Sequence, residues 1–276
     1  MITHAVKSGI VRTESPAAPV IVGVVNVTPD SFSDGGAYFD PAAAISHAAE
    51  LAAAGARIID IGGESTRPGS SPLDAETEWL RIEPVIAACA AKFHVSVDTQ
   101  KSTVAERALQ LGAKAINDVS ALRFDPRLAA VVSRFDADLV LMFSAFAEFR
   151  PPPNAPVRQY GDVIAEIAAF FRNRIAAAIS AGIDPSRIIV DPGLGAFVSK
   201  DPGYSWEIIA KLGQLRELGV SMPVMIGTSR KGFLGGAIAS RDPISQLAAL
   251  AAVRNGAKYV RTHNPAMARD LFAATL

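Results

Sequence analysis

The sequence has a single cysteine, no excess of either charge and no long apolar run, and each absence excludes a class of protein. Cys89 alone cannot form an internal disulfide or a cysteine-rich metal site. The 27 Lys and Arg residues equal the 27 Asp and Glu residues, so the basic field typical of a nucleic-acid partner is missing. No segment is long and apolar enough to cross a bilayer as a helix, and the amino terminus has no signal-peptide core. We therefore expect a cytoplasmic protein with no nucleic-acid and no membrane partner.

What the chain has is an alternation of short β-branched runs and longer alanine-rich runs over 276 residues, half of them hydrophobic. This pattern is typical of strand–helix units whose parallel strands are buried on both faces. The expected strands are residues 20–26, 57–62, 94–98, 115–118, 139–143, 187–191, 224–227 and 259–261. The expected helices include residues 41–54, 75–91, 102–111, 163–181, 205–218 and 244–255.

The number of these units favours one architecture over another. Eight strand–helix units in about 250 residues fit a single-domain (β/α)₈ barrel, an α/β fold of that typical length. A doubly wound open sheet would instead place a glycine-rich phosphate-binding sequence after its first strand. Here residues 26–30, Asn-Val-Thr-Pro-Asp, follow that strand. The sequence therefore predicts a TIM barrel over residues 20–276 after a short lead-in at residues 1–19.

Polar side chains stand at the carboxyl end of nearly every expected strand. In a barrel these ends, with the loops that follow them, carry the catalytic groups. A single Asp or Asn there can be a turn former or a helix cap, but a whole ring at one mouth favours a functional site. The ring comprises Asn26, Asp60, Asp98, Asn117, Asp118, Met142, Asp191, Thr228, Ser229, Arg261 and His263.

The ring has two kinds of chemistry. The carboxylates of Asp98 and Asp191, with Asp118 as a third candidate, and the amide of Asn117 suit a flat heterocycle that presents amidine-like N–H donors. A carboxylate accepts two parallel N–H bonds, while an amide offers both a donor and an acceptor. This side of the ring indicates a site for a nitrogen heterocycle.

The other side of the ring is cationic. Lys231, Arg261 and His263 suit a phosphate or a diphosphate. No two histidines have metal-ligand spacing, so a protein-caged zinc site is not expected. Magnesium held mainly by diphosphate oxygens would need only one protein oxygen, such as that of Asn26.

Three loops, at residues 26–36, 62–69 and 228–232, are richer in glycine and polar residues than a turn requires, as in lids that close over a reaction. With these loops the sequence resembles the dihydropteroate synthases, pterin-binding barrel enzymes of folate biosynthesis, from residue 20 to the carboxyl terminus. The motifs that carry the resemblance are NVTPDSFSDGG at 26–36, DIGGESTRPGS at 60–70, VSVDT at 95–99, INDVSA at 116–121, DPGLG at 191–195, GTSRKGF at 227–233 and VRTH at 260–263.

The resemblance implies a transferase that condenses 6-hydroxymethyl-7,8-dihydropterin diphosphate with 4-aminobenzoate to give 7,8-dihydropteroate and diphosphate. It implies a homodimer formed through helices late in the barrel, and Mg²⁺ as the cofactor. The pterin residues it implies are Asp98, Asn117, Met142, Asp191 and Lys231. The diphosphate residues are Asn26, Arg261 and His263, with Asn26 as the metal ligand. The aminobenzoate and mobile-loop residues are Asp30, Ser31, Thr66, Arg67, Pro68, Phe197, Ser229 and Arg230. The implied catalytic residues are Asp98, Asp191, Lys231, Arg261 and His263.

Two positions depart from the family pattern. Phe143 follows Met142 where the family commonly has a histidine, so the contribution of that histidine to the pocket rim is absent. Residues 195–200, Gly-Ala-Phe-Val-Ser-Lys, hold two residues more than the family's Gly-Phe-Gly-Lys. This loop is similar to that of sulfonamide-resistant forms. We therefore expect the added bulk at Phe197 or Val198 to weaken sulfonamide binding more than aminobenzoate binding.

Two other functions stay open. A methyltransferase that moves a methyl group from methyltetrahydrofolate to a corrinoid would share the Asp and Asn pterin contacts. It would not need Lys231, Arg261 and His263 as a diphosphate cluster. A non-catalytic paralogue would bind pterin without turnover, although every ring position expected to carry chemistry holds a suitable residue.

Overall fold

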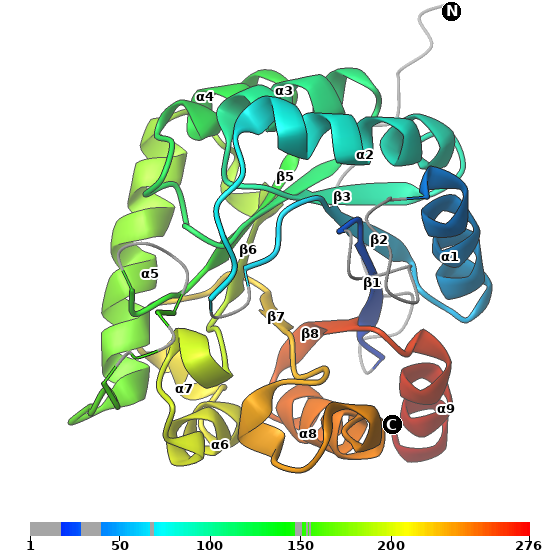
Figure 1. The fold of residues 1–276 in the computed structure, drawn as a ribbon. Helices are drawn as coiled ribbons and strands as arrows, with labels where there is room; N and C mark the ends of the chain where they lie inside the picture. Colours follow the sequence, from blue (N-terminus) through cyan, green and yellow to red (C-terminus); the bar gives the residue numbers. More distant parts are fainter. Residues whose placement is uncertain (1–17, 29–39, 67–68, 147–150, 153, 155) are drawn as a thin grey trace, which may run out of the picture.

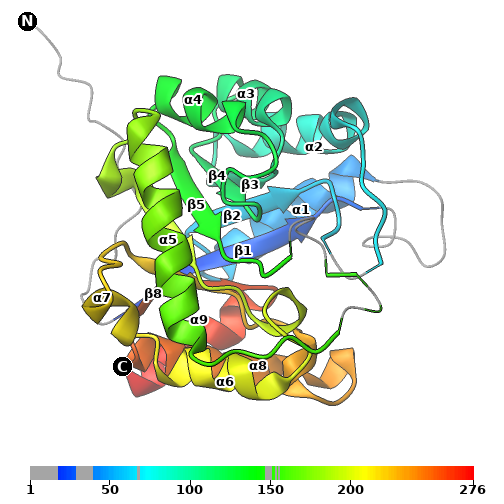
Figure 2. The same cartoon turned by 90° about the vertical axis from the view of Figure 1, so that its left-hand side faces the viewer.

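The computed structural model describes residues 18–28, 40–66, 69–146, 151–152, 154 and 156–276. Within these residues eight parallel strands close into a barrel in the order β1 to β8, with β8 pairing back onto β1. The helices lie outside the strands (Figure 1), and Figure 2 shows one long helix, α5, crossing the outside of the barrel. The predicted single-domain (β/α)₈ barrel is confirmed. Of the predicted lead-in, residues 1–17 lie outside the described residues, and the first strand begins at Val20.

The elements follow the predicted alternation. The strands are β1 (Val20–Asn26), β2 (Ile58–Gly62), β3 (His94–Asp98), β4 (Ala115–Asp118), β5 (Asp138–Met142), β6 (Ile188–Asp191), β7 (Val224–Ile226) and β8 (Ala257–Thr262). The α-helices are α1 (Pro41–Ala53), α2 (Ala75–Cys89), α3 (Ser102–Gln110), α4 (Arg127–Arg134), α5 (Val163–Ser180), α6 (Pro202–Ala210), α7 (Gln214–Glu217), α8 (Asp242–Arg254) and α9 (Pro265–Thr275). Short 3₁₀ helices are η1 (Pro185–Arg187), η2 (Gly195–Phe197), η3 (Gly232–Leu234) and η4 (Ile238–Ser240).

The helices differ from the prediction in two ways. The single helix expected over residues 205–218 is divided into α6 and α7 by residues 211–213, which include Gly213, a residue of low helix propensity. The helices α4 and α9 are not among those the sequence patterns indicated. For α9 a local signal exists, since Asn264 accepts a hydrogen bond from the N–H of Met267 and Pro265 occupies the first turn.

The barrel has two apolar layers. Strand side chains that point outward, such as Ile59, Val97 and Leu141, are fully buried against the helices. Inward-pointing side chains fill the barrel with a second cluster, which comprises Val20, Val22, Ile58, Val140, Ile189, Met225 and Tyr259. Toward the carboxyl ends of the strands the inward positions become polar, so the fold places the polar ring above an apolar plug. No helix of the described chain combines the length and the apolar character needed to span a bilayer.

Gly193 shows why one loop motif contains glycine. Its φ angle is +67°, in the left-handed region, and a Cβ atom there would lie 2.4 Å from the carbonyl oxygen of Phe143. This close approach brings the loop after β6 directly against the end of β5, where the backbone N–H of Phe143 donates to the carbonyl of Asp191 at 2.8 Å. Packing therefore requires glycine at position 193 of the DPGLG sequence.

We expect Gly193→Ala to lower the free energy of unfolding by about 2 kcal/mol or more, since it combines backbone strain with a clash against backbone. Urea unfolding followed by circular dichroism measures this loss. The control is Gly161→Ala, because a Cβ atom at Gly161 would meet nothing within 4 Å. Equal stability of the two variants would contradict the assignment.

Candidate active site

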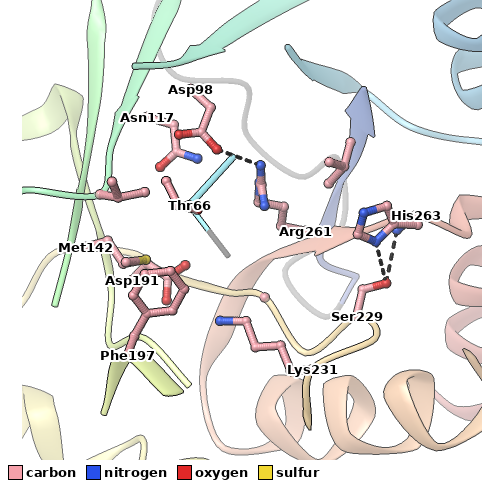
Figure 3. A pocket seen from close by; sticks show the side chains of 13 residues that line it. Thr66, Asp98, Asn117, Met142, Asp191, Phe197, Ser229, Lys231, Arg261 and His263 are labelled. Carbon is pink, nitrogen blue, oxygen red and sulfur yellow. Dashed lines mark hydrogen bonds and ion pairs between the residues drawn. The ribbon is translucent and has the colours of Figure 1, made fainter. Parts of the chain in front are cut away.

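The carboxyl ends of the strands surround a cavity that is open to solvent (Figure 3). The residues that line it are Val24, Thr66, Asp98, Asn117, Val119, Met142, Asp191, Phe197, Gly227, Ser229, Lys231, Arg261 and His263. Most of the predicted ring is therefore brought together in one place, from strands and loops spread over more than half of the chain.

One side of the cavity combines polar edges with an apolar wall. Asp98 and Asn117 are register partners on β3 and β4, so their side chains lie side by side. Met142 and Asp191 are register partners on β5 and β6. Met142 packs with Val119 and Phe197 into a small apolar cluster, described here as the apolar wall. A flat heterocycle can lie against this wall while the carboxylates and the amide meet its edge.

Arg261 reaches across the barrel from β8 to two carboxylates. Its Nε donates to Oδ2 of Asp60 at 2.6 Å, and one terminal nitrogen donates to Oδ2 of Asp98 at 2.9 Å. Burial alone would lower the pKa of this guanidinium, but the charges of Asp60 and Asp98 raise it above its usual value. Arg261 is therefore a permanent cation at the mouth of the barrel.

Burial also shifts the pKa values of Asp98, Asp191 and Lys231. It raises the pKa of Asp98 to about 7, against the lowering effect of Arg261 and with a further rise from Asp60. It also raises the pKa of Asp191, against the charge of Lys231. The pKa of Lys231 falls to about 8 because burial outweighs the attraction of Asp191. All three pKa values therefore move toward neutral pH, as is common at functional sites.

Lys231 is held by the loop after β6. Its Nζ donates to the carbonyl of Leu194 at 3.3 Å and lies 5.3 Å from the centroid of the Phe197 ring. In Figure 3 the side chain extends into the cavity from the loop after β7. The ammonium therefore sits between the carboxylate side and the edge of the apolar wall.

A chain of polar side chains joins the end of β1 to the loops after β7 and β8 on the far side of the cavity. Oγ of Ser229 lies 2.9 Å from Nδ1 of His263 and accepts the backbone N–H of His263 at 3.2 Å. The side-chain nitrogen of Asn26 lies 3.4 Å from Nε2 of His263. The amide of Asn26, at the end of β1, is thus beside the cationic side, where an oxygen ligand for a diphosphate-bound metal was predicted.

Four ring members are not in the cavity lining, namely Asn26, which lies beside His263, and Asp118, Thr228 and Asp60. Asp118 follows Asn117 on β4, so it points to the opposite face, and its carboxylate accepts the N–H groups of Ser120 and Leu122. The interpretation of Asp118 as a third heterocycle-binding carboxylate is therefore corrected. The hydroxyl of Thr228 donates to the carbonyl of Ser245. Asp60 is buried beneath the cavity rather than in its lining.

The predicted aminobenzoate and loop residues are placed unequally. Thr66, Phe197 and Ser229 line the cavity. Arg230 does not, since its guanidinium donates to the carboxylate of Asp242 at 2.9 and 3.1 Å. The other predicted loop residues, Asp30, Ser31, Arg67 and Pro68, lie outside the described residues.

A buried charge cluster supports the loop that carries Thr66, and sequence patterns gave no indication of it. Lys101, which follows β3, forms ion pairs with both Glu64 and Glu78. The second oxygen of Glu64 accepts the N–H of Leu73 at 2.8 Å, so the carboxylate ties the far end of the loop to its start. Burial raises the pKa of Glu78 while Lys101 opposes that rise. A charged residue in an otherwise ordinary helix gives no sequence signal of such a partner.

The two departures from the family pattern differ in position. Phe143 points out of the barrel and meets Phe170 of α5 edge to face, with ring centroids 5.1 Å apart. In the loop after β6, Phe197 lines the cavity, whereas Val198 is fully buried and Ser199 donates to the carbonyl of Arg158. The expected weakening of sulfonamide binding therefore depends on Phe197 and stays a prediction.

Comparison with known proteins agrees with this geometry. The family described as "pterin binding enzyme" matches residues 22–263. The dihydropteroate synthase of Mycobacterium leprae is 41% identical over 260 residues, which cover 90% of this chain and 89% of that protein. The structure of the Xanthomonas albilineans dihydropteroate synthase with 4-aminobenzoic acid superposes with a TM-score of 0.83 at 39% identity, covering 93% of this chain and 91% of the other.

A further structure of the Xanthomonas albilineans synthase, in complex with 7,8-dihydropteroate, has a TM-score of 0.80 at 37% identity and covers 93% of this chain and 92% of the other. The cavity also contains most of the polar ring that the sequence predicts. The chain belongs to the pterin-binding enzyme family and, within it, to the dihydropteroate synthases, which are transferases of folate biosynthesis.

Proposed function

We propose that the barrel mouth binds the dihydropterin diphosphate with its heterocycle against the apolar wall and its diphosphate on the cationic side. The observation that carries this assignment is the division of one cavity into a carboxylate–amide edge at Asp98, Asn117 and Asp191 and a cationic side at Arg261 and His263. The relatives bound to 4-aminobenzoic acid and to 7,8-dihydropteroate support it. The similarity to synthases also favours condensation over methyl transfer to a corrinoid.

In the proposed reaction the bond between the pterin methylene and the diphosphate oxygen breaks. Arg261 and His263 stabilise the charge that develops on the departing diphosphate. The ionised carboxylates of Asp98 and Asp191 stabilise the electron-poor methylene that remains. The aromatic amine then forms the new carbon–nitrogen bond and releases a proton to solvent. Ser229 and Lys231 hold the amine next to the methylene. The reaction between the two substrates then proceeds as an effectively unimolecular step.

We propose Mg²⁺ as the cofactor, held by diphosphate oxygens and the side-chain oxygen of Asn26. Its chemistry when bound is neutralisation of diphosphate charge. The donor set fits, because Asn26 lies beside His263 on the cationic side. Groups of three or more His, Cys, Asp or Glu that could cage a metal are not found in the part of the chain that the structure describes. A metal bound mainly by the substrate agrees with that donor set.

Asp98→Asn, Asp191→Asn and Lys231→Ala should each lower turnover by about a hundredfold or more, because each removes a charge that faces the reacting groups. The assay uses purified protein, both substrates and Mg²⁺, and a parallel reaction with a chelator should be inactive. The control is Lys211→Ala, an exposed lysine that pairs with Glu207 on the outer surface. Wild-type rates in a ring variant would remove that residue from the site, and an inactive wild type would support the non-catalytic paralogue.

Pterin binding should strengthen as the pH rises through about 7, the pKa of Asp98. The ionised carboxylate accepts N–H bonds of the heterocycle with both oxygens, whereas the protonated acid presents a donor in place of one acceptor. Burial raises this pKa, Arg261 on β8 lowers it, and the charges of Asp60 on β2, Glu78 on α2 and Asp118 on β4 raise it further. Because the folded pKa lies above the unfolded value, protonation of Asp98 stabilises the free enzyme at low pH, and this contribution is lost as the pH rises through about 7. Calorimetry with 6-hydroxymethylpterin measures the effect. A similar pH dependence in Asp98→Asn would contradict it.

We propose that the protein forms a homodimer through α6 and α8, which pack together along one side of the barrel (Figure 1). Large apolar side chains are exposed there, namely Trp206, Ile238, Ile244 and Leu247. Leu247→Glu should convert the dimer into a monomer in light scattering, because a charge would be buried in the interface. Leu80→Glu on α2 is the matched control, since Leu80 is 61% exposed and Leu247 is 58% exposed. A monomeric wild type would overturn the proposal.

A further inference from the structure

Asp60 is a buried carboxylate that contacts two residues of the cavity without lining the cavity itself. It lies on β2 and is 1% exposed. Its Oδ2 accepts from Nε of Arg261 at 2.6 Å and from Nδ2 of Asn117 at 3.1 Å. Arg261 belongs to the cationic side and Asn117 to the heterocycle edge (Figure 3). One oxygen atom therefore joins the two halves of the site.

The contact with Asn117 determines how that amide is presented. An ionised carboxylate only accepts hydrogen bonds, so the NH₂ group of Asn117 must be the end that faces Asp60. The carbonyl oxygen of the amide is then left for a ligand. Without Asp60, the two ends of the amide could exchange by rotation, and the order of donor and acceptor at the pterin edge would no longer be fixed.

The contact with Arg261 determines the position of the guanidinium. Asp98 holds one terminal nitrogen, and Asp60 holds Nε, so the plane of the group is fixed at two points. With Asp98 as the only partner, the guanidinium could pivot about a single hydrogen bond. A cation that stabilises a leaving diphosphate must be in place before the charge develops.

Stability alone does not account for Asp60. Its second oxygen, Oδ1, is buried and makes no hydrogen bond with the described residues. Asp60 also lines an interior cavity below the mouth, among apolar groups such as Val22, Ile58 and Tyr259. A half-satisfied buried carboxylate in such surroundings is destabilising, and an apolar residue would fill the barrel better.

We propose that Asp60 is a positioning residue, which fixes the Arg261 guanidinium and the Asn117 amide together and so links the diphosphate half of the site to the pterin half. The inference rests on the functions proposed above for Arg261 and Asn117. Asp60 touches neither substrate and acts only through these two side chains.

Asp60→Asn tests this, because it keeps the size of the side chain but removes the charge and the acceptor-only character. Two probes separate the halves of the site: inorganic diphosphate with Mg²⁺, and 6-hydroxymethylpterin, which carries no diphosphate. Both affinities should fall about tenfold or more in calorimetry, the loss typical of a charged hydrogen bond, while circular dichroism stays that of the wild type. An unchanged affinity for either probe in the folded variant would overturn the proposal.

Asp138→Asn is the matched control. Asp138 is also a buried carboxylate that lines the interior cavity, and it pairs with an arginine, Arg187, at 3.2 Å. It lies at the start of β5, at the opposite end of the barrel from the site. Both affinities should stay at the wild-type value in this variant. Equal losses in Asp138→Asn would show that any buried carboxylate of the barrel has the same effect, which would overturn a specific role for Asp60.

Double variants distinguish positioning from a general loss of structure. In an Arg261→Ala background, Asp60→Asn should not lower the affinity for diphosphate further but should still lower the affinity for the pterin. In an Asn117→Ala background, Asp60→Asn should lower the affinity for diphosphate but not lower the affinity for the pterin further. Additive losses in both backgrounds would contradict the inference. If Arg261→Ala and Asn117→Ala themselves leave the two affinities unchanged, the functions proposed for those residues fail instead.

Asp60→Glu provides a second variant if the Asn variant does not fold. It retains the buried charge but moves the carboxylate by one methylene, so a positioning role again predicts that both affinities fall. Wild-type affinities in a folded Asp60→Glu variant would show that only the charge matters, and that result would overturn the proposal.

Discussion

The ion pairs of Arg261 with Asp60 and Asp98 are the interaction on which the rest of the site depends. They cross the barrel from β8 to β2 and β3, and they place a permanent cation among carboxylates that are themselves buried. Asp60, held by Arg261, in turn accepts a hydrogen bond from the Asn117 amide and so fixes its position. The charge of Arg261 also lowers the pKa of Asp98 against the effect of burial. Loss of one partner would leave another buried charge uncompensated, so the members of this network cannot vary independently.

The barrel can hold such a network because its backbone is determined by other interactions. The outward-pointing strand residues pack against the helices, and the inward-pointing apolar residues fill the lower part of the barrel. These two layers supply the burial that stabilises the fold, while the carboxyl ends of the strands carry groups selected for chemistry. Burial raises the pKa of Asp98 and of Asp191 and lowers the pKa of Lys231, a pattern common at functional sites.

Much of this architecture could be predicted from the sequence, because the signals are local. Each expected strand overlaps an observed one, with bounds that differ by two residues at most, since apolar β-branched runs indicate strands buried on both faces. The strand-end residues Asp98, Asn117 and Asp191 were predicted as a ring, and the structure places them around one cavity. Helices were less well predicted. The run over residues 205–218 is divided before Gln214, and α9, which begins with the cap Asn264 and Pro265, was not predicted at all.

The sequence by itself determined the barrel, the family and most residues of the cavity, because periodicity and motifs are properties of neighbouring residues along the chain. Only the tertiary structure decided which way each side chain faces and which charges meet. Asp118 and Asn117 are adjacent in sequence, yet the alternation of the strand places only Asn117 in the cavity. Arg230 and Lys231 are adjacent too, and the partner Asp242 draws Arg230 away while Lys231 enters the site. The contact of Asp60 with Arg261 joins residues 201 positions apart. They meet because β8 closes the barrel onto β1, and β1 pairs with β2, which carries Asp60.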